Sequence, residues 1–123
     1  MNNADFKLNF PIQVLEYRVT IALSKLGLNE FYASFKYLRE ILIHIITTRN
    51  YENCNIRNYL NVIEEKHNIT KRTLLNSFTK IFKMCPNFVF SNLNKNKNIN
   101  FCVKIKILCE YVLNEIKKQN MAE

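Results

Sequence analysis

The stretch from residue 56 to residue 84 reads IRNYLNVIEEKHNITKRTLLNSFTKIFKM and decides the fold. Its apolar residues recur every three or four positions on both sides of Asn68, which predicts two amphipathic helices joined by a short connection. Thr70 precedes the second helix and is well suited to cap it, because a threonine hydroxyl can accept a hydrogen bond from a free backbone N–H. The pattern predicts a helix-turn-helix over about residues 56–84.

The chain before this stretch predicts two more helices. A first helix has Pro11 in its first turn and ends at Gly27, since glycine suits the left-handed conformation that ends many helices. A second helix is expected to take Asn29 as its N-cap and to bury apolar side chains from Phe31 onward. Because this second helix is apolar on nearly every side, we place it at the centre of the fold.

Turn residues are scarce, with one glycine and two prolines among 123 residues. A sheet protein of this size needs many tight turns, so the composition favours helices. A last helix is expected over about residues 100–118, after an Asn- and Lys-rich loop over residues 94–98. We expect residues 1–123 to form one compact all-α domain of five to six helices that contains the helix-turn-helix.

The net charge of +8 favours a polyanionic partner, with nucleic acid ahead of acidic lipid. The longest apolar run, residues 41–46, is far shorter than the roughly 20 residues of a membrane helix, so no membrane role is expected.

Four cysteines lack metal-ligand spacing and are interpreted as small buried hydrophobes in a reducing compartment. They are Cys54, Cys85, Cys102 and Cys109. We therefore expect a cytoplasmic protein.

An enzymatic function is not expected. The only aspartate is Asp5, and the single glycine, Gly27, excludes a glycine-rich loop that cradles phosphates. His44 lies inside an apolar run and is interpreted as a core histidine rather than a ligand, and His67 has no partners for a catalytic triad. We expect no cofactor, no metal site and no small-molecule substrate.

The helix predicted over about residues 71–84 has a basic outward side, which no acidic residue interrupts. Arg72 can fork onto guanine, Asn76 can pair with adenine, and Thr73 can contact a phosphate or a thymine methyl group. These three residues are the predicted base contacts. The predicted phosphate contacts are Lys71, Lys80, Lys83, Arg57, Lys95 and Lys97. A solvated, lysine-rich helix face would have the same spacing, so this alternative stays open.

The order of short motifs adds a family resemblance. Tyr37-Leu38-Arg39-Glu40 lies ten residues after the helix stop Leu26-Gly27-Leu28, and a short helix ending in Lys66-His67-Asn68 then precedes a turn and a long helix. Over about residues 14–116 the chain resembles the C-terminal effector domain of the stage zero sporulation protein A family. The resemblance implies a six-helix fold with a helix-turn-helix, and head-to-tail pairs of domains on short AT-rich promoter boxes at the bacterial nucleoid. In that family the Arg-Glu pair of the second helix is architectural, which implies that Arg39 and Glu40 form or anchor a buried polar contact.

This chain also departs from the family. The helix that reads DNA in the family is rich in arginine and glutamate, whereas here it begins Arg72-Thr73-Leu74-Leu75-Asn76. We expect a stand-alone version of the effector region without a receiver domain, and therefore no dimerisation driven by phosphorylation. The leading hypothesis is a transcription regulator that binds promoter-like, double-stranded DNA. The alternative is an interaction protein that binds and modulates a sporulation-type regulator without reading DNA, with Leu75 as a protein contact.

Overall fold

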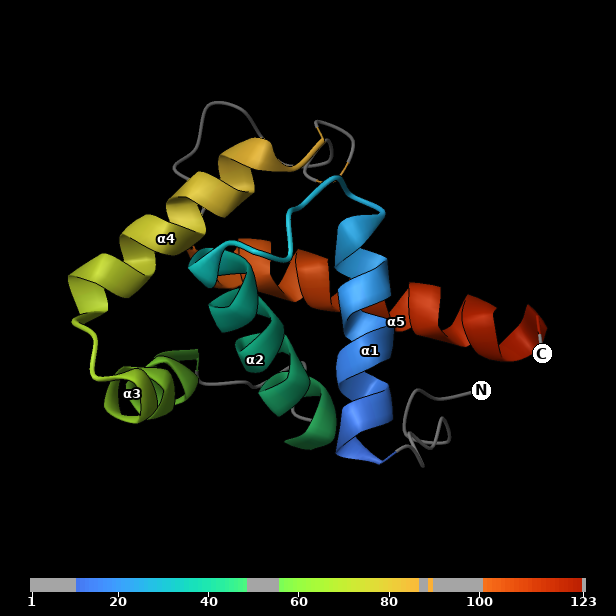
Figure 1. Cartoon of the computed structure of the whole chain (residues 1–123), viewed down its shortest axis with the longest axis horizontal. Coiled ribbons are helices and arrows are strands. Elements are labelled where there is room, and N and C mark those ends of the chain that lie inside the picture. The colour runs from blue at the N-terminus through green and yellow to red at the C-terminus, as the bar shows by residue number, and fades with distance from the viewer. Residues whose placement is uncertain (1–10, 49–55, 87–88, 90–100, 123) are drawn as a thin grey trace.

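The computed structural model describes residues 11–48, 56–86, 89 and 101–122. The helices in these ranges are α1 (Ile12–Ser24), α2 (Ala33–Thr48), α3 (Ile56–His67), α4 (Lys71–Met84) and α5 (Phe101–Ala122). They form a compact five-helix, all-α domain, and no strand occurs in the same ranges (Figure 1). The last helix extends past residue 118, where the sequence predicted its end.

The α2 helix is the centre of the fold, as its apolar composition predicts. It contacts each of the other four helices, with α1 on one side and α3 and α4 on the other (Figure 1). Its buried residues are Phe35, Leu38, Ile41, Leu42, Ile43, Ile45 and Ile46. Since these side chains point in several directions around the helix axis, α2 supplies core surface to all of its neighbours.

The first helix begins one residue later than predicted. Pro11 is the N-cap of α1 rather than part of its first turn, and its carbonyl accepts hydrogen bonds from Val14 N at 3.0 Å and Leu15 N at 3.1 Å. A proline is well placed here because it loses no N–H that the helix needs. Gly27, at φ +84°, follows the helix end and takes the left-handed conformation expected of it.

The start of α2 differs from the prediction. Asn29 does not cap this helix, because its Oδ1 accepts a hydrogen bond from Phe31 N at 2.9 Å and so forms a local turn. The first carbonyl group that accepts a hydrogen bond from α2 is that of Tyr32, whose partner is Phe35 N at 3.1 Å. The predicted burial of Phe31 is therefore also wrong, and this side chain is 84% exposed.

The connection between α3 and α4 has a well-defined geometry. Asn68 adopts a left-handed φ of 53°, and Ile69 N donates to Glu64 O at 3.2 Å, which is the Schellman arrangement that ends many helices. Thr70 then caps α4 as predicted, since its Oγ1 accepts from Thr73 N at 3.1 Å. The chain thus ends one helix and begins the next within three residues, Asn68 to Thr70.

Loss of the Thr70 cap should destabilise the fold modestly. We expect Thr70→Ala to lower the free energy of unfolding by about 1 kcal/mol, because the N–H of Thr73 loses its acceptor. Urea denaturation followed by circular dichroism measures this change. Thr79→Ala is the matched control, since the Thr79 hydroxyl only bonds back to Leu75 O within the same helix. A loss at Thr79 equal to that at Thr70 would contradict the assignment.

The α5 helix packs against α1 and α2 and is held to α1 by polar contacts at its surface. Lys25 Nζ lies 3.0 Å from Glu115 Oε2, and Arg18 Nη1 donates to Gln119 Oε1 at 3.1 Å.

Across the described ranges, no helix has both the length and the hydropathy that crossing a bilayer requires. Among the cysteines, Cys85 and Cys109 are buried and Cys102 is half-buried, while Cys54 lies outside the described residues.

Candidate nucleic-acid interface

The α4 helix turns one side to the core and the other to solvent. Its residues Leu74, Phe78, Ile81 and Phe82 are buried. Because these positions share one face of a helix, the positions on the opposite face point away from the protein. The predicted DNA contacts on α4 are all exposed, namely Lys71, Arg72, Thr73, Asn76, Lys80 and Lys83. We call these six residues the basic face of α4.

The basic face of α4 carries cations that the described part of the chain does not neutralise. All four charged residues of the helix are Lys or Arg, and none of them forms an ion pair with a described residue. The Asn76 amide likewise has no hydrogen bond within the described ranges. Unpaired guanidinium and ammonium groups are the groups that bind phosphate oxygens and guanine edges.

Thr73 has a structural role that sequence reasoning missed. The Thr73 hydroxyl oxygen accepts a hydrogen bond from Thr70 Oγ1 at 2.9 Å. The Thr70 oxygen in turn accepts the hydrogen bond from Thr73 N described above. Thr70 thus caps the backbone of α4, and the bond between the two hydroxyl groups adds a side-chain contact beside that cap. Since the Thr73 hydroxyl is exposed and still has its own hydrogen to donate, the cap leaves this group free to contact a ligand.

The structure describes only some of the predicted contacts that lie outside the basic face of α4. Arg57 is exposed in the first turn of α3, whereas Lys95 and Lys97 lie outside the described residues. Leu75, the residue that motivated a protein contact, is half-buried and packs against the core. Arg57 is thus the only predicted contact outside α4 whose exposure the structure describes.

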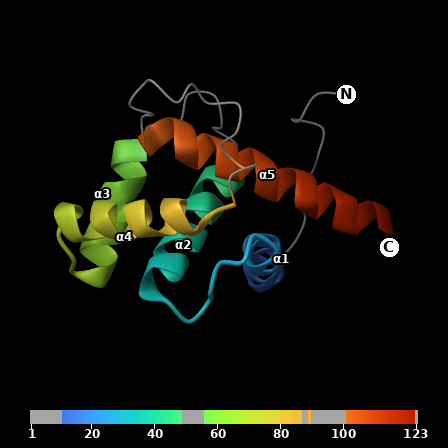
Figure 2. The same ribbon diagram turned by 90° about the horizontal axis from the view of Figure 1, so that it is seen from above.

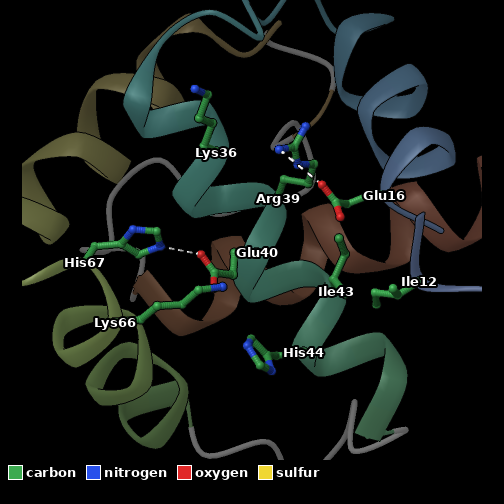
Figure 3. A pocket seen from close by; sticks show the side chains of 9 residues that line it. All are labelled: Ile12, Glu16, Lys36, Arg39, Glu40, Ile43, His44, Lys66 and His67. Atoms are coloured by element: carbon green, nitrogen blue, oxygen red, sulfur yellow. Dashed lines mark hydrogen bonds and ion pairs between the residues drawn. The ribbon is translucent and has the colours of Figure 1, made fainter. Parts of the chain in front are cut away.

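The last residues of α3 are tied to the middle of α2 through Glu40. Lys66 Nζ donates to Glu40 Oε1 at 2.6 Å, and His67 Nε2 lies 2.7 Å from Glu40 Oε2 (Figure 3). The His67 ring also lies 5.1 Å from the Tyr37 ring between centroids. These contacts fix the end of α3 directly before the connection to α4. No spacing rule predicts them, because Glu40 and Lys66 are 26 residues apart in the chain.

Arg39, the neighbour of Glu40, makes the corresponding link from α2 to α1. Its Nη1 donates to Thr20 Oγ1 at 3.0 Å, and its Nη2 lies 3.5 Å from Glu16 Oε1. Two adjacent residues of α2 thus hold α2 to the helices on its two sides. The architectural role that the resemblance implies for Arg39 and Glu40 stays a prediction.

His44 lies on the outer side of α2 rather than in the core. It is half-buried, lines a pocket between α1, α2 and α3, and has its ring 6.2 Å from that of Tyr59. The prediction of a core histidine is therefore wrong, because this side of α2 is not fully covered by α1 and α3. Among the described residues, no three His, Cys, Asp or Glu side chains are grouped closely enough to hold a metal ion.

Comparisons with protein families, with curated proteins and with solved structures found no match. Function is therefore inferred from two features of the molecule: the basic face of α4, and the contacts of Glu40 that hold α3 in place beside α2.

The Glu40 carboxylate should make stability depend on pH on the acid side. Burial raises its pKa, but hydrogen bonds and attraction from Lys66 and His67 outweigh burial, so the pKa lies below the ordinary 4.5. A lowered pKa in the folded state adds stability above the pKa of the unfolded chain, and this stability is lost as pH falls through the folded value. The contribution is therefore fully present at neutral pH, begins to decline as the pH falls below about 4.5, and is lost once the pH is below the lowered pKa of the folded state.

We expect Glu40→Gln to lower the free energy of unfolding at neutral pH by about 1 kcal/mol and to reduce its fall in acid. Urea denaturation over a pH series measures both effects. Glu65→Gln is the control, since Glu65 is exposed on α3 and has no ion pair with a described residue. If the free energy of unfolding of Glu40→Gln fell in acid as much as that of the unmodified protein, the Glu40 carboxylate would not contribute to stability.

Proposed function

We propose that this protein binds double-stranded DNA sequence-specifically, with α3 and α4 as a helix-turn-helix and α4 as the recognition helix. The observation that carries the proposal is the basic face of α4. Its six polar or cationic residues are exposed, five of them on one side of a capped helix and Lys71 at the start of that helix, and no carboxylate lies among them. Such a face is complementary to the phosphates and base edges of a major groove.

The arrangement of α3 and α4 supports this proposal. A 12-residue helix and a 14-residue helix are joined by three residues, as in helix-turn-helix domains. In Figure 1, α3 is seen nearly end-on while α4 runs across the view, so the two helices have clearly different directions. Seen from above, both lie at one end of the molecule, away from the C-terminal half of α5 (Figure 2). Nothing described lies over the outer side of α4.

The order of residues along α4 assigns roles within the proposed complex. Arg72, Thr73 and Asn76 lie in the first two turns, where a recognition helix contacts base edges. Lys80 and Lys83 lie further along and are assigned to phosphates, together with Lys71 and with Arg57 of α3. In this scheme Glu40 positions the helix pair, since it fixes the residues of α3 that precede the connection.

The resemblance to the sporulation regulator family adds a biological role to the proposal. The protein would then act as a transcription regulator at the bacterial nucleoid, with pairs of domains bound to tandem promoter sites. The first turn of α4 has no glutamate, so we propose a target sequence different from that of the family. This role rests on the short motifs around Arg39 and Glu40 and on the order of the helices.

Binding to DNA should be strongly salt-dependent. The four phosphate contacts assigned above and the two predicted from the sequence at Lys95 and Lys97 make six. The logarithm of the association constant should therefore fall with the logarithm of the salt concentration with a slope of about −5. Fluorescence anisotropy of a labelled, mixed-sequence duplex at several salt concentrations measures the slope. A control protein in which Lys80 and Lys83 are both replaced by Gln should show a slope shallower by about 2. Absence of binding at low salt would refute the proposal.

A second candidate function is binding to a sporulation-type regulator without reading DNA. The observation in its favour is the exposed aromatic pair between α1 and α2, Phe31 and Tyr32, which are 84% and 50% exposed. Large exposed aromatic side chains are enriched in protein interfaces. This function would replace the first if the protein failed to bind DNA and formed a complex that Phe31→Ser abolished.

A further inference from the structure

A pocket of about 390 Å³ lies on the outer side of α2, between α1 and α3 (Figure 3). This volume is at the lower end of the range for small-molecule sites. Lys36 and Arg39 lie toward the start of α2, His44 lies at the opposite end, and Glu16 and Ile12 come from α1 (Figure 3). The pocket is distinct from the basic face of α4, because none of its lining residues belongs to α4.

The charges in the pocket do not cancel. Its two carboxylates already have partners, since Glu16 pairs with Arg39 and Glu40 pairs with Lys66. Lys36 also lines the pocket, and its ammonium has no hydrogen bond or ion pair to any residue that the structure describes. Three permanent cations, Lys36, Arg39 and Lys66, therefore face two anions. The surplus positive charge favours an anionic group at this end of the pocket.

Hydrogen-bond donors are also available there. Arg39 uses one nitrogen for Thr20 and another for Glu16, and a guanidinium group has five N–H donors in total. Lys36 adds an ammonium group with three donors. A carboxylate or phosphate bound beside these two side chains would receive charge-assisted hydrogen bonds.

The other wall of the pocket is apolar. Ile12 is 51% exposed although it is a large aliphatic residue, and Ile43 lines the pocket from the surface of α2. Covering such side chains removes apolar surface from water and is favourable by about 25 cal/mol per Å². The pocket thus combines a cationic end with an apolar wall, and a small organic anion can use both.

We propose that this pocket binds a small organic anion, whose carboxylate or phosphate group lies beside Lys36 and Arg39 and whose apolar part covers Ile12 and Ile43. The chemistry is that of an aromatic or aliphatic acid rather than that of a free inorganic ion. The site is formed by residues outside the proposed DNA contacts, so it is a second binding site on the same domain.

Isothermal titration calorimetry with four probes tests this site: phenyl phosphate, phenylacetate, inorganic phosphate and phenol. The first two carry both an anionic group and an apolar ring, and comparing them distinguishes a phosphate ligand from a carboxylate. We expect at least one of them to bind about 10-fold or more tightly than inorganic phosphate and phenol, which each lack one of the two features.

Variants of the pocket should affect the two parts of the ligand separately. Lys36→Gln should weaken the tighter phenyl compound about 10-fold, and Ile12→Ser should weaken it several-fold. Lys118→Gln on α5 and Val62→Ser on α3 are matched controls that remove an exposed charge and an exposed aliphatic side chain outside the pocket. Both controls should bind the probe like the unmodified protein.

Three results would overturn the proposal: no binding of either phenyl compound at millimolar concentration, equal binding of all four probes, or equal weakening in pocket and control variants. Circular dichroism of each variant verifies that the fold is intact. The titrations contain no DNA, so their outcome is independent of whether α4 binds DNA.

Discussion

Replacing Arg72 by alanine is expected to weaken binding to the preferred DNA site by about 1–3 kcal/mol, or roughly 5-fold to 150-fold. Arg72 is exposed in the first turn of α4 and forms no ion pair with a described residue, so its guanidinium group is available to a guanine edge. Loss of a base contact should also relax specificity at one position of the site. Anisotropy titrations with the preferred duplex and with single-base variants measure both effects.

Lys83→Ala is the matched comparison for Arg72→Ala. Lys83 lies in the last turn of the same helix and is assigned to a phosphate, which has the same chemistry in every sequence. Its loss should therefore weaken binding to all duplexes by similar factors and should reduce the salt slope by about 1. If both substitutions weakened all sequences equally, the assignment of Arg72 to a base would be wrong.

Phe78→Ala is expected to lower the free energy of unfolding by about 3–5 kcal/mol. The Phe78 side chain is fully buried on the inner side of α4, and its ring lies 5.3 Å from Phe101 and 6.4 Å from Phe82 between centroids. Removing the ring leaves a cavity where α4 meets α5, and neighbouring residues cannot fill it without moving a helix. Urea denaturation measures the loss.

Phe31→Ala is the control for Phe78→Ala, because the same side chain is removed from a position that is mostly exposed. It should change stability by no more than about 0.5 kcal/mol. A loss at Phe78 as small as that at Phe31 would mean that α4 does not pack against the core through Phe78, and the inner and outer sides of α4 would then have to be reassigned.

Most helix positions in this chain follow from the spacing of apolar residues and from capping residues. The prediction fails where one residue suits two local structures. The amphipathic pattern of α4 and its Thr70 cap are confirmed, because both depend on residues within one or two helical turns. The start of α2 was predicted wrongly because Asn29 suits both a cap and a turn, and its side chain bonds to Phe31 N instead of to a helix. Local spacing alone cannot choose between these two uses of an asparagine.

Contacts between distant residues account for most of what the sequence did not predict about the candidate site. Exposure of the basic face follows from the periodicity of α4, so the cations on it could be identified in advance. The pairs of Glu40 with Lys66 and His67 could not be identified in this way, since they depend on how α2 packs against α3. The pocket beside Lys36 and Ile12 also results from packing, because it exists only where α1 and α3 leave part of α2 uncovered. The assignment of α3 and α4 as a helix-turn-helix and the binding of DNA by α4 remain predictions.

Selection of DNA from a random duplex pool, followed by sequencing of the retained fraction, tests the central claim most directly. The unmodified protein, incubated with the pool at moderate salt, should enrich one short motif, and Arg72→Ala should lose the preference at one position of that motif. Retention of DNA without any enriched motif would contradict sequence-specific reading by α4. Failure to retain DNA at any salt concentration would contradict DNA binding altogether.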